Sequence, residues 1–345
     1  AGRPCKHCKP FNMNILICGG AGFMGSHFVK YILNKYPDYK VVNFDKLTYA
    51  GNLDNLNEVK ENPNYRFVKG DICDAQAVEK VISELKIDVI LNYAAETHVD
   101  RSIMNPDAFL QTDVFGVYNL LEATKKFNLQ KMVQVSTDEV YGSIDKGKFT
   151  EESGFAPNSP YAASKAGGDL LCRSYFTTYQ TPVVVTHSCN FIGENQYPEK
   201  LIPLFITNLL EGKKVPLYGD GQNVREFIYK DDHCRAIDVI LHKAKPGSVY
   251  NIGSGEEMKN IDVTNMILKN LGFGKEMIEY VKDRPGHDRR YAINAKKIKK
   301  ELGWQAQVSF EEGLKKTIAW YKENSVWWKK IKDGSYKEYY KKQYK

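Results

Sequence analysis

Asn14-Ile-Leu-Ile-Cys-Gly-Gly-Ala-Gly-Phe-Met-Gly-Ser26 is the stretch of the chain that decides the fold. An apolar run typical of a β-strand leads directly into closely spaced glycines, after which a helix is expected from Ser26. Glycines at such a junction permit a tight turn, let the backbone approach a pyrophosphate and allow the helix to pack closely on the strand. Asp45 follows about twenty residues later, at the end of the next apolar run. Together they predict the first βα unit of a dinucleotide-binding sheet.

Similar short runs rich in β-branched residues recur along the first half of the chain. Each precedes a segment able to form a helix or loop, and the five runs lie at 40–44, 65–69, 88–92, 131–135 and 182–186. A strand can reach a parallel neighbour only through a long crossover connection. We therefore predict an α/β protein with a Rossmann-type, doubly wound parallel sheet.

After about residue 190 the pattern breaks into shorter pieces punctuated by Pro and Gly, which predicts a smaller C-terminal α/β domain that binds substrate. We expect the cofactor-binding domain at 13–190, rejoined by 235–257 through a strand at 249–253. The second domain is expected at 191–234 and 258–330. Terminal tails are predicted at 1–12 and 331–345, with the aromatic and basic stretch from Trp327 onward solvated.

The charge of the chain is concentrated at its ends. Of the net charge of +7, residues 1–9 contribute +3 and residues 329–345 contribute +5, so the body carries about −1. A basic groove for nucleic acid is therefore not expected. No apolar run approaches the roughly 20 residues of a membrane helix, and the start of the chain lacks the apolar centre of a signal peptide. We expect a cytoplasmic protein without a membrane partner.

Seven cysteines are scattered without a disulfide-framework spacing, as is typical of reduced thiols. The pair Cys5-x-x-Cys8 resembles half a zinc site, but no second pair of ligands matches it. We therefore predict no metal site.

Asp45 also bears on the choice of cofactor. A carboxylate at this position accepts hydrogen bonds from ribose hydroxyls and repels a 2′-phosphate, which favours NAD over NADP. Lys46 beside it weakens that preference. Asp71-Ile72 and Tyr93-Ala-Ala-Glu-Thr97 follow the third and fourth runs, where ligands of such sheets bind.

Two further motifs carry the chemistry. Tyr161-Ala-Ala-Ser-Lys165 places Lys165 one helical turn after Tyr161, where its ammonium is expected to lower the phenol pKa and make it a base. Adjacent carboxylates, Asp138 and Glu139, follow the fifth run directly. Two carboxyl groups in different surroundings can act as one acid and one base, although a helix-capping or surface acidic pair is the alternative.

Several longer motifs give the chain a family resemblance. They are Ala94-Ala-Glu-Thr-His-Val-Asp-Arg-Ser102, Ser136-Thr-Asp-Glu-Val-Tyr-Gly142, Asn158-Ser-Pro-Tyr161, Tyr197-Pro-Glu-Lys-Leu-Ile-Pro203, Tyr218-Gly-Asp-Gly-Gln-Asn-Val-Arg225 and Asp283-Arg-Pro-Gly-His-Asp-Arg-Arg290. In these the chain resembles the extended short-chain dehydrogenase/reductase family and, within it, the dTDP-glucose 4,6-dehydratases. The likeness runs from Met13 to about Trp328.

The resemblance implies a nucleotide-sugar hydro-lyase. Tyr161, with Thr137 and Lys165, is expected to take the proton of the sugar 4-hydroxyl as a hydride passes to NAD. Glu139 then removes the C5 proton while Asp138 protonates the departing 6-hydroxyl, and the hydride returns to C6. A homodimer is also implied.

The resemblance also assigns binding residues. Together with the glycine turn, the expected cofactor contacts are Gly19, Gly22, Phe23, Met24, Gly25, Asp45, Lys46, Thr48, Asp71, Ile72, Tyr93, Ala94, Ala95, Thr97, Thr112, Tyr161 and Lys165. The expected nucleotide-sugar contacts are Thr97, Thr137, Asn190, Lys200, Leu201, Pro216, Tyr218, Arg225, Asn260, Arg284 and His287. Guanidinium groups at Arg225 and Arg284 suit a diphosphate, with structural ion pairs as the alternative.

One segment departs from the family pattern. Asn190-Phe-Ile-Gly-Glu-Asn-Gln196 stands where Asn-Asn-Tyr-Gly-Pro-Tyr-Gln is usual, and His187 replaces an arginine. Loss of an amide and a phenol at Phe191 and Ile192 is expected to make the sugar pocket more apolar. A UDP-N-acetylglucosamine 4,6-dehydratase is therefore an alternative. More distant alternatives are a 4-epimerase, which needs no Asp-Glu pair, and a non-catalytic NAD-binding regulator.

Overall fold

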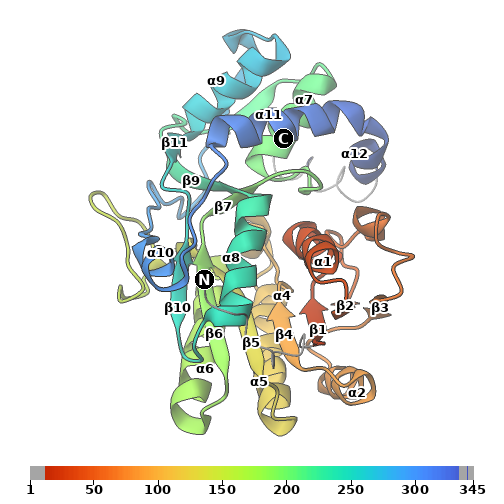
Figure 1. Ribbon diagram of the computed structural model, residues 1–345. Helices are drawn as coiled ribbons and strands as arrows, with labels where there is room; N and C mark the ends of the chain where they lie inside the picture. The colour runs from red at the N-terminus through yellow and green to blue at the C-terminus, as the bar shows by residue number, and fades with distance from the viewer. Residues whose placement is uncertain (1–11, 334–339, 341–345) are drawn as a thin grey trace, which may run out of the picture.

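The computed structural model describes residues 12–333 and residue 340, and its largest element is a seven-stranded sheet (Figure 1). In spatial order the strands are β10 (Val249–Ile252), β6 (Val183–Ser188), β5 (Lys131–Thr137), β4 (Val89–Asn92), β1 (Asn14–Cys18), β2 (Lys40–Asp45) and β3 (Tyr65–Lys69). Every neighbouring pair is parallel. The predicted Rossmann-type sheet is confirmed, and the strand expected at 249–253 forms one edge of it.

Helices cover both faces of this sheet. Along β1, Ile15 and Ile17 face one core while Leu16 and Cys18 face the other, because successive strand residues point to opposite sides. The first core is closed by α1 (Phe23–Lys35), α8 (Lys230–Lys243) and α10 (Lys296–Leu302). The second is closed by α2 (Ala75–Leu85), α5 (Val117–Lys126) and α6 (Pro160–Tyr179).

Short helical segments follow the carboxyl ends of the strands. They are the 3-10 turn η1 (Leu53–Leu56), the helices α3 (Val99–Met104) and α4 (Asp107–Leu110), the π-helical segment η2 (Gln111–Gly116) and the 3-10 turn η3 (Asp138–Tyr141). η2 joins α4 to α5, and η3 continues β5 without a break. These connections border the end of the sheet at which ligands of such folds bind.

The second unit lies at the top of Figure 1 and has its own hydrophobic core. Its strands are β7 (Asn190–Ile192), β9 (Val224–Tyr229) and β11 (Glu257–Lys259) in one sheet, and β8 (Val215–Tyr218) with β12 (Ile278–Val281) in another. Its helical elements are α7 (Leu201–Leu210), α9 (Asn260–Leu271), the 3-10 turn η4 (Lys275–Met277), α11 (Phe310–Glu323) and α12 (Ser325–Lys332). The predicted smaller C-terminal α/β unit is confirmed.

The last described helix, α12, corrects one expectation. Trp328 is only 1% exposed, and its indole N–H donates to the Tyr321 carbonyl at 2.8 Å. Lys332 is also buried and donates to Glu211 Oε2 at 2.8 Å. The solvated tail predicted from Trp327 onward is therefore wrong as far as Lys332, because an amphipathic helix with two tryptophans buries its apolar face.

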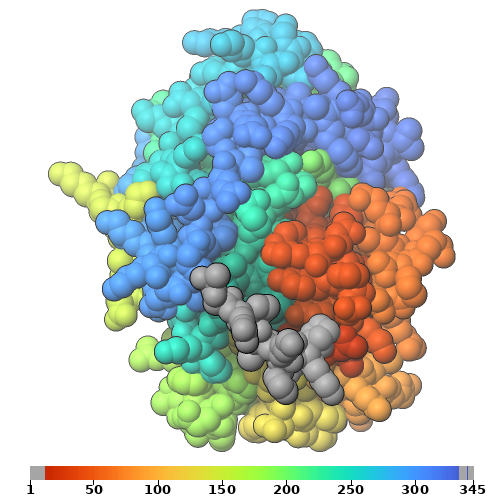
Figure 2. Space-filling view, in the orientation of Figure 1, coloured from red at the N-terminus to blue at the C-terminus, as the bar shows by residue number. Residues whose placement is uncertain are grey.

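Figure 2 shows this C-terminal region, in blue, lying directly against the N-terminal region, in red and orange. The contact includes a hydrogen bond from Trp327 Nε1 to Asn55 Oδ1 at 3.0 Å and an ion pair between Lys330 and Asp54 at 2.9 Å. Helix α12 therefore ties the second unit to the loop that follows β2.

In the part of the chain that the structure describes, no helix has the length and apolar character needed to cross a membrane. Within the same residues, no group of three or more His, Cys, Asp or Glu side chains is placed to hold a metal ion. Cys5 and Cys8 lie outside the described residues. The five described cysteines are all free thiols.

Truncation of Trp328 tests the role of α12. Trp328→Ala is expected to lower the free energy of unfolding by about 3–5 kcal/mol, since it removes a large, fully buried side chain. Val326→Ala on the same helix is the control, because Val326 is 81% exposed. Denaturant unfolding of both variants measures the difference, and equal stabilities would contradict the assignment of α12 to the core.

Candidate active site

The glycine turn after β1 is built for close approach. Gly19 has a φ of +75°, and a Cβ atom there would lie 2.6 Å from the backbone nitrogen of Ala94. A Cβ atom on Gly25 would lie 2.1 Å from the Gly19 carbonyl oxygen. Helix α1 begins at Phe23, earlier than the predicted Ser26, with Gly22 as its N-cap. Its free N–H groups therefore border the turn, an arrangement that suits a phosphate.

A cavity of about 270 Å³ opens at this turn and runs along the carboxyl ends of the strands. The structure brings every predicted cofactor contact to its wall: Gly19, Gly22, Phe23, Met24, Gly25, Asp45, Lys46, Thr48, Asp71, Ile72, Tyr93, Ala94, Ala95, Thr97, Thr112, Tyr161 and Lys165. They come from six separate segments of the chain, so the topology of the sheet is what gathers them.

Asp45 and Lys46 are held differently at the end of β2. Asp45 is buried and accepts backbone N–H groups from Ala21 at 2.9 Å and Leu47 at 2.8 Å. Burial raises its pKa, and these two bonds oppose the rise. Lys46 Nζ lies 2.6 Å from Asp71 Oδ2, so its charge is paired. The 2′-phosphate of NADP would therefore be repelled by Asp45 and would find no unpaired charge on Lys46 to attract it.

The predicted catalytic residues reach the same cavity from two elements. Thr137 ends β5, Asp138 and Glu139 open η3, and Tyr161 and Lys165 lie in the first turns of α6. The Thr137 hydroxyl accepts the Glu139 N–H at 3.2 Å and so fixes the turn from strand into η3. All five side chains line one space.

The surroundings of Asp138 favour its protonated form. It is 2% exposed, and burial, followed by the nearby charges of Glu139 and Glu226, raises its pKa well above the usual range. The Thr137 hydroxyl donates to Asp138 Oδ1 at 3.4 Å, whereas Oδ2 has no hydrogen-bond partner among the described residues. A carboxyl group that stays protonated near neutral pH can donate a proton.

The expected effect of Lys165 on Tyr161 is not what the structure shows. Lys165 donates to the Val135 carbonyl at 2.9 Å instead of the phenol. Burial, followed by the charges of Glu139 and Asp113, raises the pKa of Tyr161 well above its usual value, while a hydrogen bond with Thr137 lowers it. The phenol therefore needs a further positive charge in the cavity before it can ionise.

Asp113 is a buried acid that sequence reasoning missed. It lies in the π-helical segment η2, where it accepts the Ser164 hydroxyl at 2.8 Å and the Glu96 N–H at 3.3 Å. Burial raises its pKa to about 7, although Lys165 opposes the rise. Single π-turns often mark functional sites, but no motif in the sequence indicates this one.

Four predicted substrate contacts, Thr97, Thr137, Asn190 and Lys200, also line the cavity. The other seven lie outside its wall: Leu201, Pro216, Tyr218, Arg225, Asn260, Arg284 and His287. The predicted substrate set is thus divided between the cavity and the second unit.

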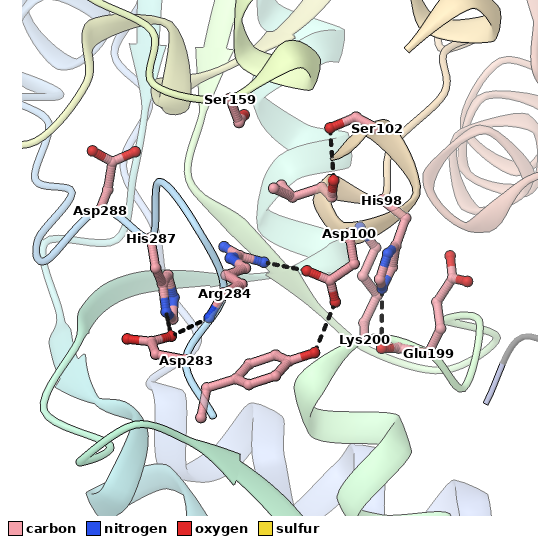
Figure 3. A network of polar contacts seen from close by, with 12 residues as sticks. His98, Asp100, Ser102, Ser159, Glu199, Lys200, Asp283, Arg284, His287 and Asp288 are labelled. Carbon is pink, nitrogen blue, oxygen red and sulfur yellow. Dashed lines mark hydrogen bonds and ion pairs between the residues drawn. The ribbon is translucent and has the colours of Figure 1, made fainter. Parts of the chain in front are cut away.

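Asp100 links part of this outer set (Figure 3). It points from α3 toward the loop at 283–288, where Oδ1 lies 3.4 Å from Arg284 Nη1, and Oδ2 accepts the Tyr218 hydroxyl at 3.0 Å. On the same loop His287 Nδ1 lies 2.6 Å from Asp283 Oδ1. Asp100 is buried. The sequence assigned it no role, although it lies within the motif at 94–102.

This outer cluster is rich in positive charge. Burial, together with the nearby Arg284 and Arg225, lowers the pKa of His287 to about 4, so the ring is neutral near pH 7. Lys200 donates to the Thr97 carbonyl, and its pKa is lowered by burial. Arg284 Nε is buried and finds no hydrogen-bond partner in the described part of the chain. An unpaired, buried guanidinium nitrogen fits an anionic ligand.

The segment that departs from the family pattern changes the cavity less than expected. Phe191 lines the cavity, but Ile192 is 1% exposed and packs in the core of the second unit. His187 also lies off the cavity wall, hydrogen-bonded to Tyr141 at 2.6 Å and to Asp169 at 3.2 Å. The predicted apolar pocket is therefore wrong for Ile192, because successive strand residues face opposite sides.

This arrangement of a glycine turn, a Tyr-x-x-x-Lys helix and a β5 terminus on one cavity defines an extended short-chain dehydrogenase/reductase. A sequence model of the family described as GDP-mannose 4,6 dehydratase matches residues 16–317, and the chain belongs to this family.

Individual relatives agree. The chain is 48% identical to a dTDP-glucose 4,6-dehydratase of Streptomyces niveus, covering 93% of this chain and 96% of that one. A dTDP-glucose 4,6-dehydratase of Streptomyces venezuelae, solved with NAD bound, shares 49% identity and a TM-score of 0.90 over 92% of this chain and all of that one. A UDP-glucose 4-epimerase of Thermotoga maritima reaches 30% identity and a TM-score of 0.84, covering 91% and 100% of the two chains. The chain is thus a dTDP-glucose 4,6-dehydratase-like member of the superfamily.

Asp113 gives the site a pH-dependent stability. Its folded pKa of about 7 lies above the ordinary aspartate pKa of 3.8, so the folded state binds the proton more tightly, and stability is lost as pH rises from about 4 to about 7. Asp113→Asn removes this charge and can keep both hydrogen bonds. The melting temperature of the variant relative to wild type is expected to increase between pH 5 and pH 8. A difference that does not change with pH would contradict the burial argument.

Proposed function

We propose that this chain is an NAD-dependent dTDP-glucose 4,6-dehydratase, which converts the nucleotide sugar to its 4-keto-6-deoxy form and releases water. The observation that carries the proposal is the meeting of Asp138, Glu139 and Tyr161 on one cavity with the glycine turn. An oxidoreductase that only moves a hydride needs the phenol but not the two carboxyl groups.

The residues present fit NAD. The turn at Gly19 and Gly25 leaves no room for side chains, and the start of α1 offers backbone N–H groups for a pyrophosphate. In this proposal Asp45 accepts hydrogen bonds from the adenosine ribose hydroxyls and repels a 2′-phosphate. When bound, NAD supplies a positively charged hydride acceptor for the first step and the same hydride for the last.

Tyr161 is the base for the sugar 4-hydroxyl in this proposal. Its hydrogen bond with Thr137 lowers the pKa of the phenol, and the positive charge that NAD brings would lower it further. Lys165 lines the same cavity and is fixed by the Val135 carbonyl. Oxidation at C4 makes the C5 proton acidic, because the carbanion is conjugated with the new ketone.

The two carboxyl groups divide the elimination between them. Glu139 takes the C5 proton, and the protonated Asp138 gives a proton to the departing 6-hydroxyl, which leaves as water. Reduction at C6 and return of a proton to C5 complete the product. Each turnover thus leaves Tyr161 with one proton gained and Asp138 with one proton lost. Thr137 is hydrogen-bonded to both, so in this proposal its hydroxyl relays the proton from Tyr161 back to Asp138.

The nucleotide diphosphate is assigned to the outer cluster. Arg284, with its unpaired Nε, and Arg225 provide guanidinium groups for phosphate oxygens. Tyr218, Lys200 and His287 complete the cluster around them. In this proposal residues 13–190 with 235–257 carry the cofactor, and 191–234 with 258–330 carry the nucleotide, including Leu201, Pro216 and Asn260.

The alternatives fit less well. The matched dehydratases are dTDP-glucose enzymes, and only Phe191 of the two apolar replacements borders the cavity, so a UDP-N-acetylglucosamine substrate gains no support. A 4-epimerase eliminates no water, so it does not require an acid at Asp138 and a base at Glu139. A non-catalytic regulator requires none of the five residues at the end of β5 and the start of α6.

We also propose a cytoplasmic homodimer. Free thiols are typical of a reducing compartment. Large apolar side chains are exposed on the neighbouring elements η2, α5 and α6, and exposed apolar patches are typical of protein interfaces. The members of this apolar patch are Phe115, Tyr118, Leu170 and Tyr179.

Incubation with three nucleotide sugars tests the proposed activity. With dTDP-glucose, the mass of the product is expected to be lower than that of the substrate by one water molecule. After alkali treatment, the 4-keto-6-deoxy sugar is expected to absorb near 320 nm. UDP-glucose and UDP-N-acetylglucosamine are expected to react more slowly. Unchanged mass with dTDP-glucose would contradict the proposal. The matched variant Glu139→Gln is expected to form NADH slowly without losing water, whereas Glu84→Gln on the exposed face of α2 should behave as wild type.

A charge in the apolar patch tests the dimer. Leu170 is 54% exposed on α6, so Leu170→Glu is expected to leave the fold intact and convert the dimer to monomer in light scattering. A wild-type protein that is monomeric at micromolar concentration would contradict this assembly.

A further inference from the structure

We propose that Glu194 is a positioning residue for the cofactor. It anchors the turn at 193–197, one wall of the cavity, so that NAD stays bound between the two hydride transfers. The inference rests on the proposed function and extends it to a residue to which the sequence assigned no role. Glu194 follows β7 and lies in the segment that departs from the family pattern.

The turn at 193–197 contacts the cavity through some of its residues only. Asn195, Gln196 and Tyr197 line the cavity, whereas Glu194 lies outside its wall. Asn195 has a φ of +61°, in the left-handed region that few residues other than glycine adopt without cost. Such a conformation persists only where the surroundings hold it. The turn therefore depends on contacts with neighbouring elements.

The carboxylate of Glu194 makes two of these contacts. Oε1 accepts the Tyr229 hydroxyl at 2.9 Å, and Oε2 lies 3.3 Å from Lys230 Nζ. Burial, followed by the charge of Glu194, raises the pKa of Tyr229 well above its usual value, so the phenol remains a donor. Burial lowers the pKa of Lys230, but the charges of Glu194 and Asp231 raise it by more. The carboxylate is thus fixed by one phenol and one ammonium group.

The backbone of Glu194 makes the third contact, with α1. Its carbonyl oxygen lies 2.9 Å from His27 Nε2. Burial, followed by the charges of Lys230 and Lys30, lowers the pKa of His27 well below its usual value, so the ring is neutral and donates through Nε2. His27 packs edge-on against Phe23, a residue of the cavity wall, and α1 lies beside α8 (Figure 1). The turn is therefore tied to the helix whose start borders the glycine turn.

The proposed reaction requires the cofactor to stay in place between two steps. The hydride taken from C4 returns to C6 only after water has left, so a cofactor released in between would leave the sugar unreduced. In this proposal NAD lies between the start of α1 and the turn at 193–197. Because Glu194 ties these two segments together, its truncation lets the turn move away from the cofactor.

Exchange of bound NAD for radiolabelled NAD tests this role without any sugar. Glu194→Ala removes both carboxylate contacts and is expected to accelerate NAD release roughly 10- to 100-fold, the worth of hydrogen bonds to a charged group. Glu194→Gln keeps an acceptor for Tyr229, so its acceleration is expected to stay below about 10-fold. During turnover of dTDP-glucose the Glu194→Ala variant is also expected to lose activity progressively and to regain it when NAD is added.

Glu211→Ala is the matched control. Glu211 is a carboxylate of similar exposure, 21% against 19%, paired with Lys332 at 2.8 Å and outside the cavity wall. The melting temperatures of the two NAD-free alanine variants are expected to be similar, whereas Glu211→Ala should release NAD as wild type does. Wild-type NAD release in both Glu194 variants, or equal acceleration in Glu211→Ala, would overturn the inference. A wild-type protein that holds NAD but forms no 4-keto sugar would instead contradict the proposed function.

Discussion

Three ionisable groups, Asp138, Glu139 and Tyr161, share one poorly hydrated space at the carboxyl end of β5, and the rest of the site depends on how their charges are kept apart. Burial favours the neutral form of each acid, and each negative charge disfavours the next. The pKa values of Asp138 and Tyr161 are both raised, with the charge of Glu139 as a cause each time. Asp138 and Tyr161 are therefore the proton-bearing groups of the site, which is the starting state that the proposed elimination requires.

The fold creates this crowding through strand register. β5 is central in the sheet, with β4 and β6 as its neighbours, and Thr137 pairs with Ser188 at its last position. The chain then turns through η3, so the successive carboxyl groups of Asp138 and Glu139 reach the same cavity. In a continuing strand the two side chains would point to opposite faces of the sheet. Lys165, Arg225, Arg284 and Lys200 surround this negative centre from α6 and the second unit. Their positive charges offset it and leave anion-binding groups at the outer end.

The sequence predicted the parts of the fold that local patterns determine. The strand at Asn14–Cys18 is where the apolar run placed it, and each later run became a parallel strand. The residues of the glycine turn and of the β5 terminus also converge as their spacing implied. Features that depend on tertiary packing were missed. Asp113 gains its place from a π-turn, Trp328 from docking of α12, and Asp100 from contacts across more than a hundred residues. Ile192 was predicted to line the sugar pocket but packs in the core of the second unit. The side of the sheet to which a strand residue points therefore decides whether it can contact a ligand.

In the proposed reaction one hydride leaves C4 of the sugar and returns to C6 of the same molecule. The most direct test is turnover of dTDP-[4-²H]glucose in ordinary water, followed by NMR and mass analysis of the 4-keto-6-deoxy product. One deuterium is expected at C6 in nearly every product molecule, at all enzyme concentrations. Loss of the label to solvent, or a product without deuterium at C6, would contradict it.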